Sequence, residues 1–70
     1  MKKIKTEKIG DVTASLYLES LGYTYKIRAK IKGSSSRIVA RSYAYITDRK
    51  KAEELMQADL FNITQQLKLF

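Results

Sequence analysis

The sequence predicts an α+β fold in which a three-stranded antiparallel β-meander packs on one C-terminal α-helix. Apolar and polar residues alternate between residues 9 and 46, as they do in half-buried strands. Glycine and serine divide this alternation into three runs, and after residue 47 the apolar period lengthens to that of an amphipathic helix. We therefore expect a single 70-residue domain, with a basic arm at 1–8, a sheet at 9–46 and a helix at 48–70.

The first two segments are the arm and the first strand. Residues 1–8 are polar and rich in lysine, which is typical of a loose arm or of the start of a strand. From residue 9 to 21 the side chains alternate until Gly22 marks a tight turn. One side is then expected to hold Val12, Ala14, Leu16 and Leu18, and the other Thr13, Ser15, Tyr17 and Glu19.

The second strand, residues 23–32, has the most regular alternation in the chain. Its cations fall on one face about 7 Å apart, close to the roughly 6 to 7 Å between successive phosphates of a nucleic-acid strand. The spacing therefore points to a polyanionic partner. The two faces are expected to hold Thr24, Lys26, Arg28, Lys30 and Lys32 against Tyr23, Tyr25, Ile27, Ala29 and Ile31.

A turn at residues 33–36 leads into the third strand, residues 37–46. Short connections between successive strands predict antiparallel pairing. The face toward the helix is expected to hold Ile38, Ala40, Ser42, Ala44 and Ile46, and the other face Arg37, Val39, Arg41, Tyr43 and Tyr45.

The helix is expected to begin at Thr47 or Asp48, either of which can cap free backbone N–H groups. Its first turn holds Arg49, Lys50 and Lys51, which oppose the helix dipole. These bases either serve a partner or are simply solvated. The apolar stripe is expected to comprise Ala52, Leu55, Met56, Leu60 (or Asp59), Ile63 and Leu67, while Phe61, Leu69 and Phe70 lie off it and close the core edge or make a dimer contact.

The composition limits the chemistry that the protein can perform. The chain has no histidine and no cysteine, which excludes disulfides, thiolate zinc sites and imidazole catalysis. No spaced carboxylate pair, glycine-rich phosphate loop or metal-ligand cluster is present in the sequence, so we expect no enzyme, metal or cofactor. Without a membrane span or signal-peptide core, we expect a soluble cytoplasmic protein, as a monomer or a homodimer.

Positive charge is concentrated before the helix. Residues 1–47 hold ten Lys or Arg against three acids, which accounts for the whole net charge of +7. Such an asymmetry favours a polyanionic partner. Arginine with exposed aromatics is typical of interfaces, although lysines on a solvated face also help to prevent aggregation. The candidate binding residues are Tyr17, Lys26, Arg28, Lys30, Lys32, Arg37, Arg41, Tyr43 and Tyr45, with Arg49, Lys50 and Lys51 secondary.

Residues 25–55 combine an alternating basic and aromatic strand with the helix start T-D-R-K-K-A-E-E-L. This stretch resembles the arm-type, AP2-like DNA-binding domains of tyrosine integrases, whose T-x-x-x-A close is one residue shorter. The resemblance implies three strands and a helix that place the exposed sheet face in the major groove of DNA. It would make Lys26, Arg28, Lys30, Arg37, Arg41 and Tyr43 the contacting residues.

Two other resemblances leave the partner open. The strand order and the helix start Lys50, Lys51, Ala52 are similar to the second half of a double-stranded-RNA-binding domain, where the helix N-terminus meets the phosphates. The size and composition also resemble small phage proteins, including anti-CRISPR inhibitors. The leading hypothesis is a non-enzymatic nucleic-acid-binding module from a phage or mobile element, with DNA preferred over RNA. The alternative is a phage inhibitor that binds a host protein or ribonucleoprotein through the same face.

Overall fold

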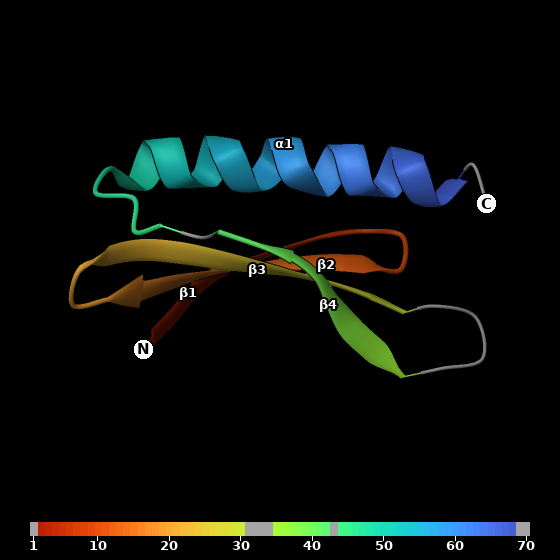
Figure 1. The fold of residues 1–70 in the computed structure, drawn as a ribbon, viewed down its shortest axis with the longest axis horizontal. Coiled ribbons are helices and arrows are strands. Elements are labelled where there is room, and N and C mark those ends of the chain that lie inside the picture. The colour runs from red at the N-terminus through yellow and green to blue at the C-terminus, as the bar shows by residue number, and fades with distance from the viewer. Residues whose placement is uncertain (1, 31–34, 43, 69–70) are drawn as a thin grey trace.

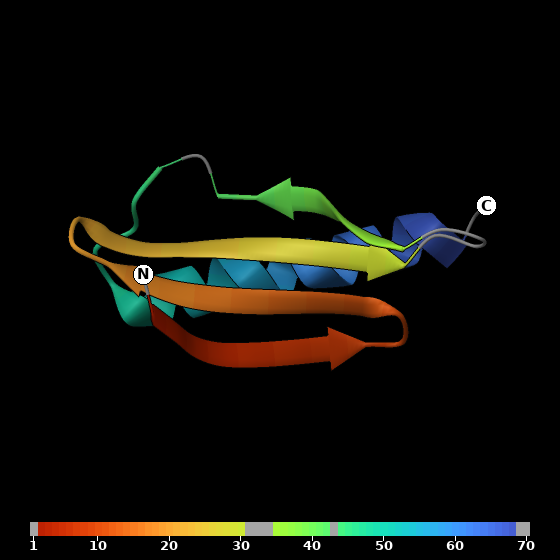
Figure 2. The ribbon, with the colours of Figure 1, turned by 90° about the horizontal axis from the view of Figure 1, so that it is seen from below.

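A four-stranded antiparallel sheet packs one face against a single helix. The computed structural model describes residues 2–30, 35–42 and 44–68, with side chains up to Gln66. The strands follow one another across the sheet in chain order, and the helix crosses the face of the sheet lengthwise (Figures 1 and 2). The elements are β1 (Lys2–Ile9), β2 (Val12–Glu19), β3 (Gly22–Lys30), β4 (Ser36–Arg41) and α1 (Arg49–Lys68). The predicted α+β class is confirmed, but the sheet has four strands and not three.

The additional strand is β1, which we expected to be an arm. It pairs with β2 from Lys2 opposite Leu18 to Ile9 opposite Val12. A bulge between Lys3 and Lys5 interrupts the alternation, and Ile4 packs against the core. Because a bulge shifts the side-chain period by one residue, the pattern of apolar residues in β1 does not look like a strand.

Two-residue turns join the first three strands. Gly10 and Asp11 connect β1 to β2. Gly10 has a φ of 59°, a left-handed conformation that two-residue hairpin turns commonly assign to glycine. At the other end of the sheet β3 begins at Gly22, whose φ is 144°. A Cβ added to Gly22 would lie 2.8 Å from the carbonyl oxygen of Ile46, so glycine is required there for conformation and for space.

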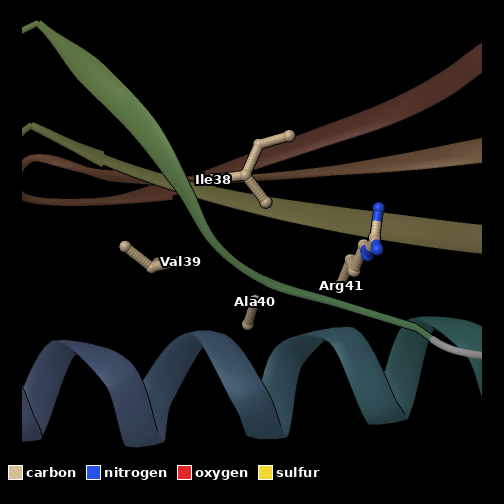
Figure 3. A pocket seen from close by; sticks show the side chains of 4 residues that line it. All are labelled: Ile38, Val39, Ala40 and Arg41. Carbon is tan, nitrogen blue, oxygen red and sulfur yellow. The ribbon is translucent and has the colours of Figure 1, made fainter.

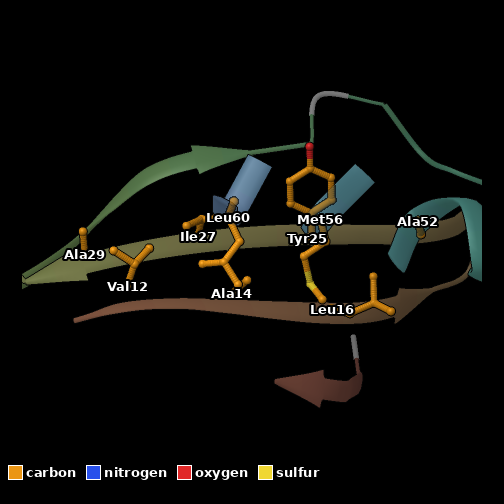
Figure 4. Close-up of a cluster of buried hydrophobic side chains, with 9 residues drawn as sticks. All are labelled: Val12, Ala14, Leu16, Tyr25, Ile27, Ala29, Ala52, Met56 and Leu60. Atoms are coloured by element: carbon orange, nitrogen blue, oxygen red, sulfur yellow. The ribbon is translucent and has the colours of Figure 1, made fainter. Parts of the chain in front are cut away.

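The core lies between α1 and the two central strands, as Figure 4 shows. Leu16, Ile27 and Met56 have no exposed surface, and Leu60 is almost as deeply buried. Alanines at the contact allow the helix to approach the sheet closely, because their side chains end at Cβ. The buried apolar residues are Val12, Ala14, Leu16, Tyr25, Ile27, Ala29, Ala52, Met56 and Leu60.

Several residues predicted to be in the core are exposed instead. Leu18 is 40% exposed, Ile38 42% and Leu55 42%, and Ala44 is also exposed. The buried stripe of α1 runs through Ala52, Met56, Leu60 and Thr64, so Leu55 lies at its margin. Ile31 and the side chain of Leu67 lie outside the described residues.

Strand β4 ends at Arg41, five residues earlier than predicted, and contains a bulge. Ile27 of β3 lies opposite Ala40, but the next residue, Arg28, lies opposite Ile38, so Val39 has no partner. The chain then leaves the sheet and returns only at Ile46, which forms an isolated bridge with Tyr23. Ser42 continues the ladder briefly, since its N–H donates to the Tyr25 carbonyl at 3.0 Å and its Oγ accepts from the Tyr25 N–H at 3.1 Å.

Asp48 caps the helix, which confirms one of the two capping residues that the sequence predicted. Its carboxylate accepts a hydrogen bond from the Lys50 N–H at 3.0 Å, and its carbonyl accepts from the Ala52 N–H at 2.9 Å. The capping carboxylate also places a negative charge at the positive end of the helix dipole, which offsets the bases of the first turn.

One buried polar contact joins the sheet to the helix. The hydroxyl of Tyr25 donates to the carboxylate of Asp59, and Tyr25 itself is only 7% exposed. Burial, followed by this hydrogen bond and the charge of Asp59, raises the pKa of Tyr25 far above its ordinary value of 10.

Replacing the two turn glycines separates conformational cost from steric cost. We expect Gly22→Ala to destabilise the fold by about 2 kcal/mol or more, because the left-handed φ and the contact with Ile46 both oppose a Cβ. Gly10→Ala meets no atom within 4 Å and should cost only about 1 kcal/mol. Urea denaturation measures both variants, and equal losses would contradict the structure around Gly22.

Because of Tyr25, the free energy of unfolding should decrease as the pH becomes alkaline. Below about pH 10 its hydroxyl is protonated in the folded and unfolded chains alike. Above that pH only the unfolded chain loses the proton, so unfolding becomes more favourable as pH rises. The stability advantage of the natural protein over Tyr25→Phe should therefore shrink between about pH 9 and 11. A gap that stays constant in denaturation curves across this range would refute the raised pKa.

Candidate functional site

The candidate site is the sheet face that points away from α1, which we call the open face. Residues directly opposite one another in neighbouring strands share a face, so the register assigns its members. Thr6, Ser15, Lys26 and Arg41 form one row across all four strands. Its described members are Lys3, Thr6, Lys8, Thr13, Ser15, Tyr17, Glu19, Thr24, Lys26, Arg28, Lys30, Ser36, Ile38 and Arg41.

Most of the candidate binding residues meet on this face. Lys26, Arg28 and Lys30 alternate with the buried residues of β3, as predicted, and Arg41 lies directly opposite Lys26. Tyr17 lies on β2 beside them. Lys32 and Tyr43 lie outside the described residues.

The bulge at Val39 overturns two assignments in β4. Arg37 was expected on the open face, but it lies opposite Ala29, whose side chain faces the helix. Ile38 was expected in the core, but it lies opposite Arg28 and joins the open face. Tyr45 is 47% exposed and precedes the bridge residue Ile46, with its Cβ close to Gly22 at the start of β3.

Two cations of the open face were not among the candidates. Lys3 lies opposite Tyr17, and Lys8 lies opposite Thr13, because residues 2–9 form a strand. The dipeptide Gly10 and Asp11 between Ile9 and Val12 is a hairpin signal that could have revealed this strand. With these two the described part of the open face holds six cations: Lys3, Lys8, Lys26, Arg28, Lys30 and Arg41.

The ion pairs of the described residues lie on the helix side. Lys5 Nζ lies 3.4 Å from Glu7 and 3.6 Å from Glu53, and Arg49 lies 3.4 Å from Glu53. Among residues 2–30, 35–42 and 44–66, none of the six open-face cations has a carboxylate oxygen within 4.0 Å. Their mutual repulsion is therefore not offset by nearby acids within this part of the chain.

The open face is not uniform along its length. Lys26 Nζ lies 5.4 Å from the centre of the Tyr17 ring, within the range of a cation–π contact. Glu19 accepts a hydrogen bond from Thr24 Oγ1 at 2.8 Å near the β2–β3 turn. One end therefore carries an aromatic ring and an acid, while Lys8, Arg28 and Lys30 lie toward the other end.

The secondary candidates Arg49, Lys50 and Lys51 do not extend this site. They are exposed in the first turn of α1, and the helix lies on the opposite side of the sheet (Figure 1). A ligand bound flat on the open face does not reach them.

Comparisons with models of protein families, with characterised proteins and with solved structures found no match for the chain. Across the described ranges, no helix has the length and apolar character needed to cross a membrane. Within the same ranges no cluster of three or more Asp or Glu side chains could hold a metal ion.

Removing a charge from the open face should not cost stability. Arg41 lies opposite Lys26, so Arg41→Gln relieves a like-charge contact and should raise the free energy of unfolding by about 0.3 kcal/mol. Lys5→Gln is the matched control, since it removes the same charge but breaks two ion pairs and should lower that free energy by a similar amount. Urea denaturation at low ionic strength measures both, and a loss in Arg41→Gln would show that the charge serves the fold.

Proposed function

We propose that the protein is a non-enzymatic nucleic-acid-binding module, encoded by a phage or mobile element, which binds through its open face. The observation that carries this proposal is the segregation of charge. Six cations lie on one face, none of them with a described carboxylate oxygen within 4.0 Å, while Lys5 and Arg49 on the other side have acidic partners. A protein gains no stability from such a face, so a polyanionic ligand explains its retention better than folding does.

The chemistry of the face suits a nucleic-acid backbone. Successive cations of β3 are about 7 Å apart, and Arg41 of β4 lies about 5 Å across from Lys26, which allows several phosphates to be contacted together. Thr6 and Thr13 add hydroxyl groups that can donate to phosphate oxygens. Tyr17 adds an aromatic ring that can pack on a sugar or an exposed base.

Duplex DNA is the nucleic acid that we favour. Two neighbouring strands fit the major groove of B-DNA, which is about 12 Å wide, whereas the major groove of duplex RNA is too narrow for side chains to read. The longest dimension of the protein is 36 Å, about one turn of B-DNA. The molecule therefore covers about one turn of the duplex at most, with the strands β3 and β4 in the groove for part of that length.

A second candidate rests on the position of Ile38. This residue is 42% exposed and lies on the open face opposite Arg28. An exposed apolar side chain next to an arginine suits the centre of a protein interface. The second candidate is therefore a phage inhibitor of host defence, of the anti-CRISPR kind, that binds a host protein or ribonucleoprotein through this face.

The salt dependence of binding tests the main proposal. If all six cations contact phosphates, the logarithm of the affinity for a duplex of about 20 base pairs should fall against the logarithm of salt concentration with a slope of roughly −5. The triple variant Lys26→Gln/Arg28→Gln/Lys30→Gln removes three phosphate contacts. Its slope should therefore be shallower by about 3, and its affinity should be lower for all DNA sequences. Fluorescence anisotropy with labelled duplex DNA, single-stranded DNA and duplex RNA gives both quantities and the order of preference.

The helix provides a control with the same change in net charge. Arg49→Gln/Lys50→Gln/Lys51→Gln also removes three cations, but from the side of the protein opposite the open face. Its affinity and salt slope should stay close to those of the natural protein. Equal losses in the two triple variants would assign the binding to net charge alone, and no affinity at about 50 mM salt would exclude nucleic acid as the ligand.

A further inference from the structure

The outer edge of β4 is a second exposed feature, separate from the cations of β1 to β3. Strand β4 is last in the sheet order, and within the described residues only β3 pairs with it. A free strand edge offers backbone donors and acceptors to another strand. This edge is apolar at its centre, with Ile38 42% and Val39 37% exposed, and basic at Arg37 and Arg41.

Side chains on both sides of β4 form a groove along this edge. Ile38 and Arg41 point away from the helix, and Ala40 points toward it (Figure 3). A hollow of about 310 Å³ is lined by Ile38, Val39, Ala40 and Arg41. A second hollow of about 340 Å³ shares Arg41 and extends toward α1, where its lining includes Tyr25, Ser42, Ala44, Ile46, Leu55 and Asp59.

The helix leaves this groove uncovered. It packs on β2 and β3 and reaches β1, but it makes few contacts with β4. Leu55, 42% exposed, borders the second hollow from the helix. The chain therefore presents an apolar strip that runs from β4 to the margin of α1.

The charges around the edge determine what can pair with it. In an antiparallel pair of two copies centred on Val39, Arg37 and Arg41 of both copies would gather along the seam, on opposite faces of the joined sheet, and their like charges repel. The other free edge, β1, carries Lys2, Lys3, Lys5 and Lys8 and is also a poor partner for β4. A second copy of the chain is therefore disfavoured in both arrangements.

We propose that the edge of β4 binds an extended acidic peptide segment of another protein, which adds a fifth strand to the sheet. Acidic side chains of the peptide pair with Arg37 and Arg41. Apolar side chains between them pack on Ile38 and Val39 and in the groove beside Leu55. Backbone hydrogen bonds supply affinity and the alternating side chains supply specificity, as in other cases of strand addition.

A synthetic peptide tests strand addition directly. The probe is a blocked seven-residue peptide, long enough to span the six residues of β4, in which two glutamates three residues apart point to opposite faces as Arg37 and Arg41 do, with valine and threonine at the other positions. We expect it to shift the backbone amide resonances of β4 and to slow their hydrogen exchange, while the amides of β1 are unchanged. No shift at up to about 1 mM peptide would overturn the proposal.

Two control peptides and one variant separate strand pairing from simple charge attraction. Alternate N-methylation of the peptide blocks its hydrogen bonds with one neighbouring strand and should weaken binding at least tenfold, as should replacement of its glutamates by lysines. Arg37→Glu leaves Arg41 in place, so it should abolish the preference for the glutamate peptide over the lysine peptide, yet leave DNA binding by the open face nearly unchanged. An N-methylated peptide that binds equally well would refute the proposal. Sedimentation experiments that show the natural protein to dimerise through β4 would refute it as well.

Discussion

The packing of α1 across β2 and β3 is the contact on which the rest of the molecule depends. It buries Met56 and Leu60 against Leu16 and Ile27, and alanines at positions 14, 29 and 52 keep the two layers close. A chain of this size can form few other apolar contacts, since a 60-residue domain buries only about 60% of its unfolded surface. Once one face of the sheet is committed to the helix, every second residue of β2 and β3 must face away from it, and these are the residues available for binding.

Strand β3 shows that the sequence alone can predict which side chains face the helix and which face away from it. Its alternation is regular, so the burial of Tyr25, Ile27 and Ala29 places Lys26, Arg28 and Lys30 on the open face without any knowledge of the neighbours. The helix was equally predictable, because a capping residue, Asp48, coincides with the change of period. In both elements local geometry and tertiary packing require the same pattern of residues.

The errors lie where a single extra residue shifts that pattern. Bulges at Ile4 and Val39 displace the alternation by one position, which hid β1 and exchanged the expected faces of Arg37 and Ile38. Nothing in the side chains of residues 37–41 marks the bulge, because it arises from pairing with β3 and from the departure of the chain after Arg41. The position of Leu55 was misjudged for a related reason, since the width of the buried stripe depends on where β4 ends.

The order of strands across the sheet has a consequence for how the chain reaches this structure. Each strand pairs with its neighbour in the sequence, and two of the three connections are two-residue turns. Hairpins of this kind close short loops, which costs little chain entropy and favours fast folding. The helix must find more distant partners, as when Gln57 donates to Glu7 across fifty positions of sequence. The sheet can therefore assemble by successive local steps, and the docking of the helix is the step that makes the assembly cooperative.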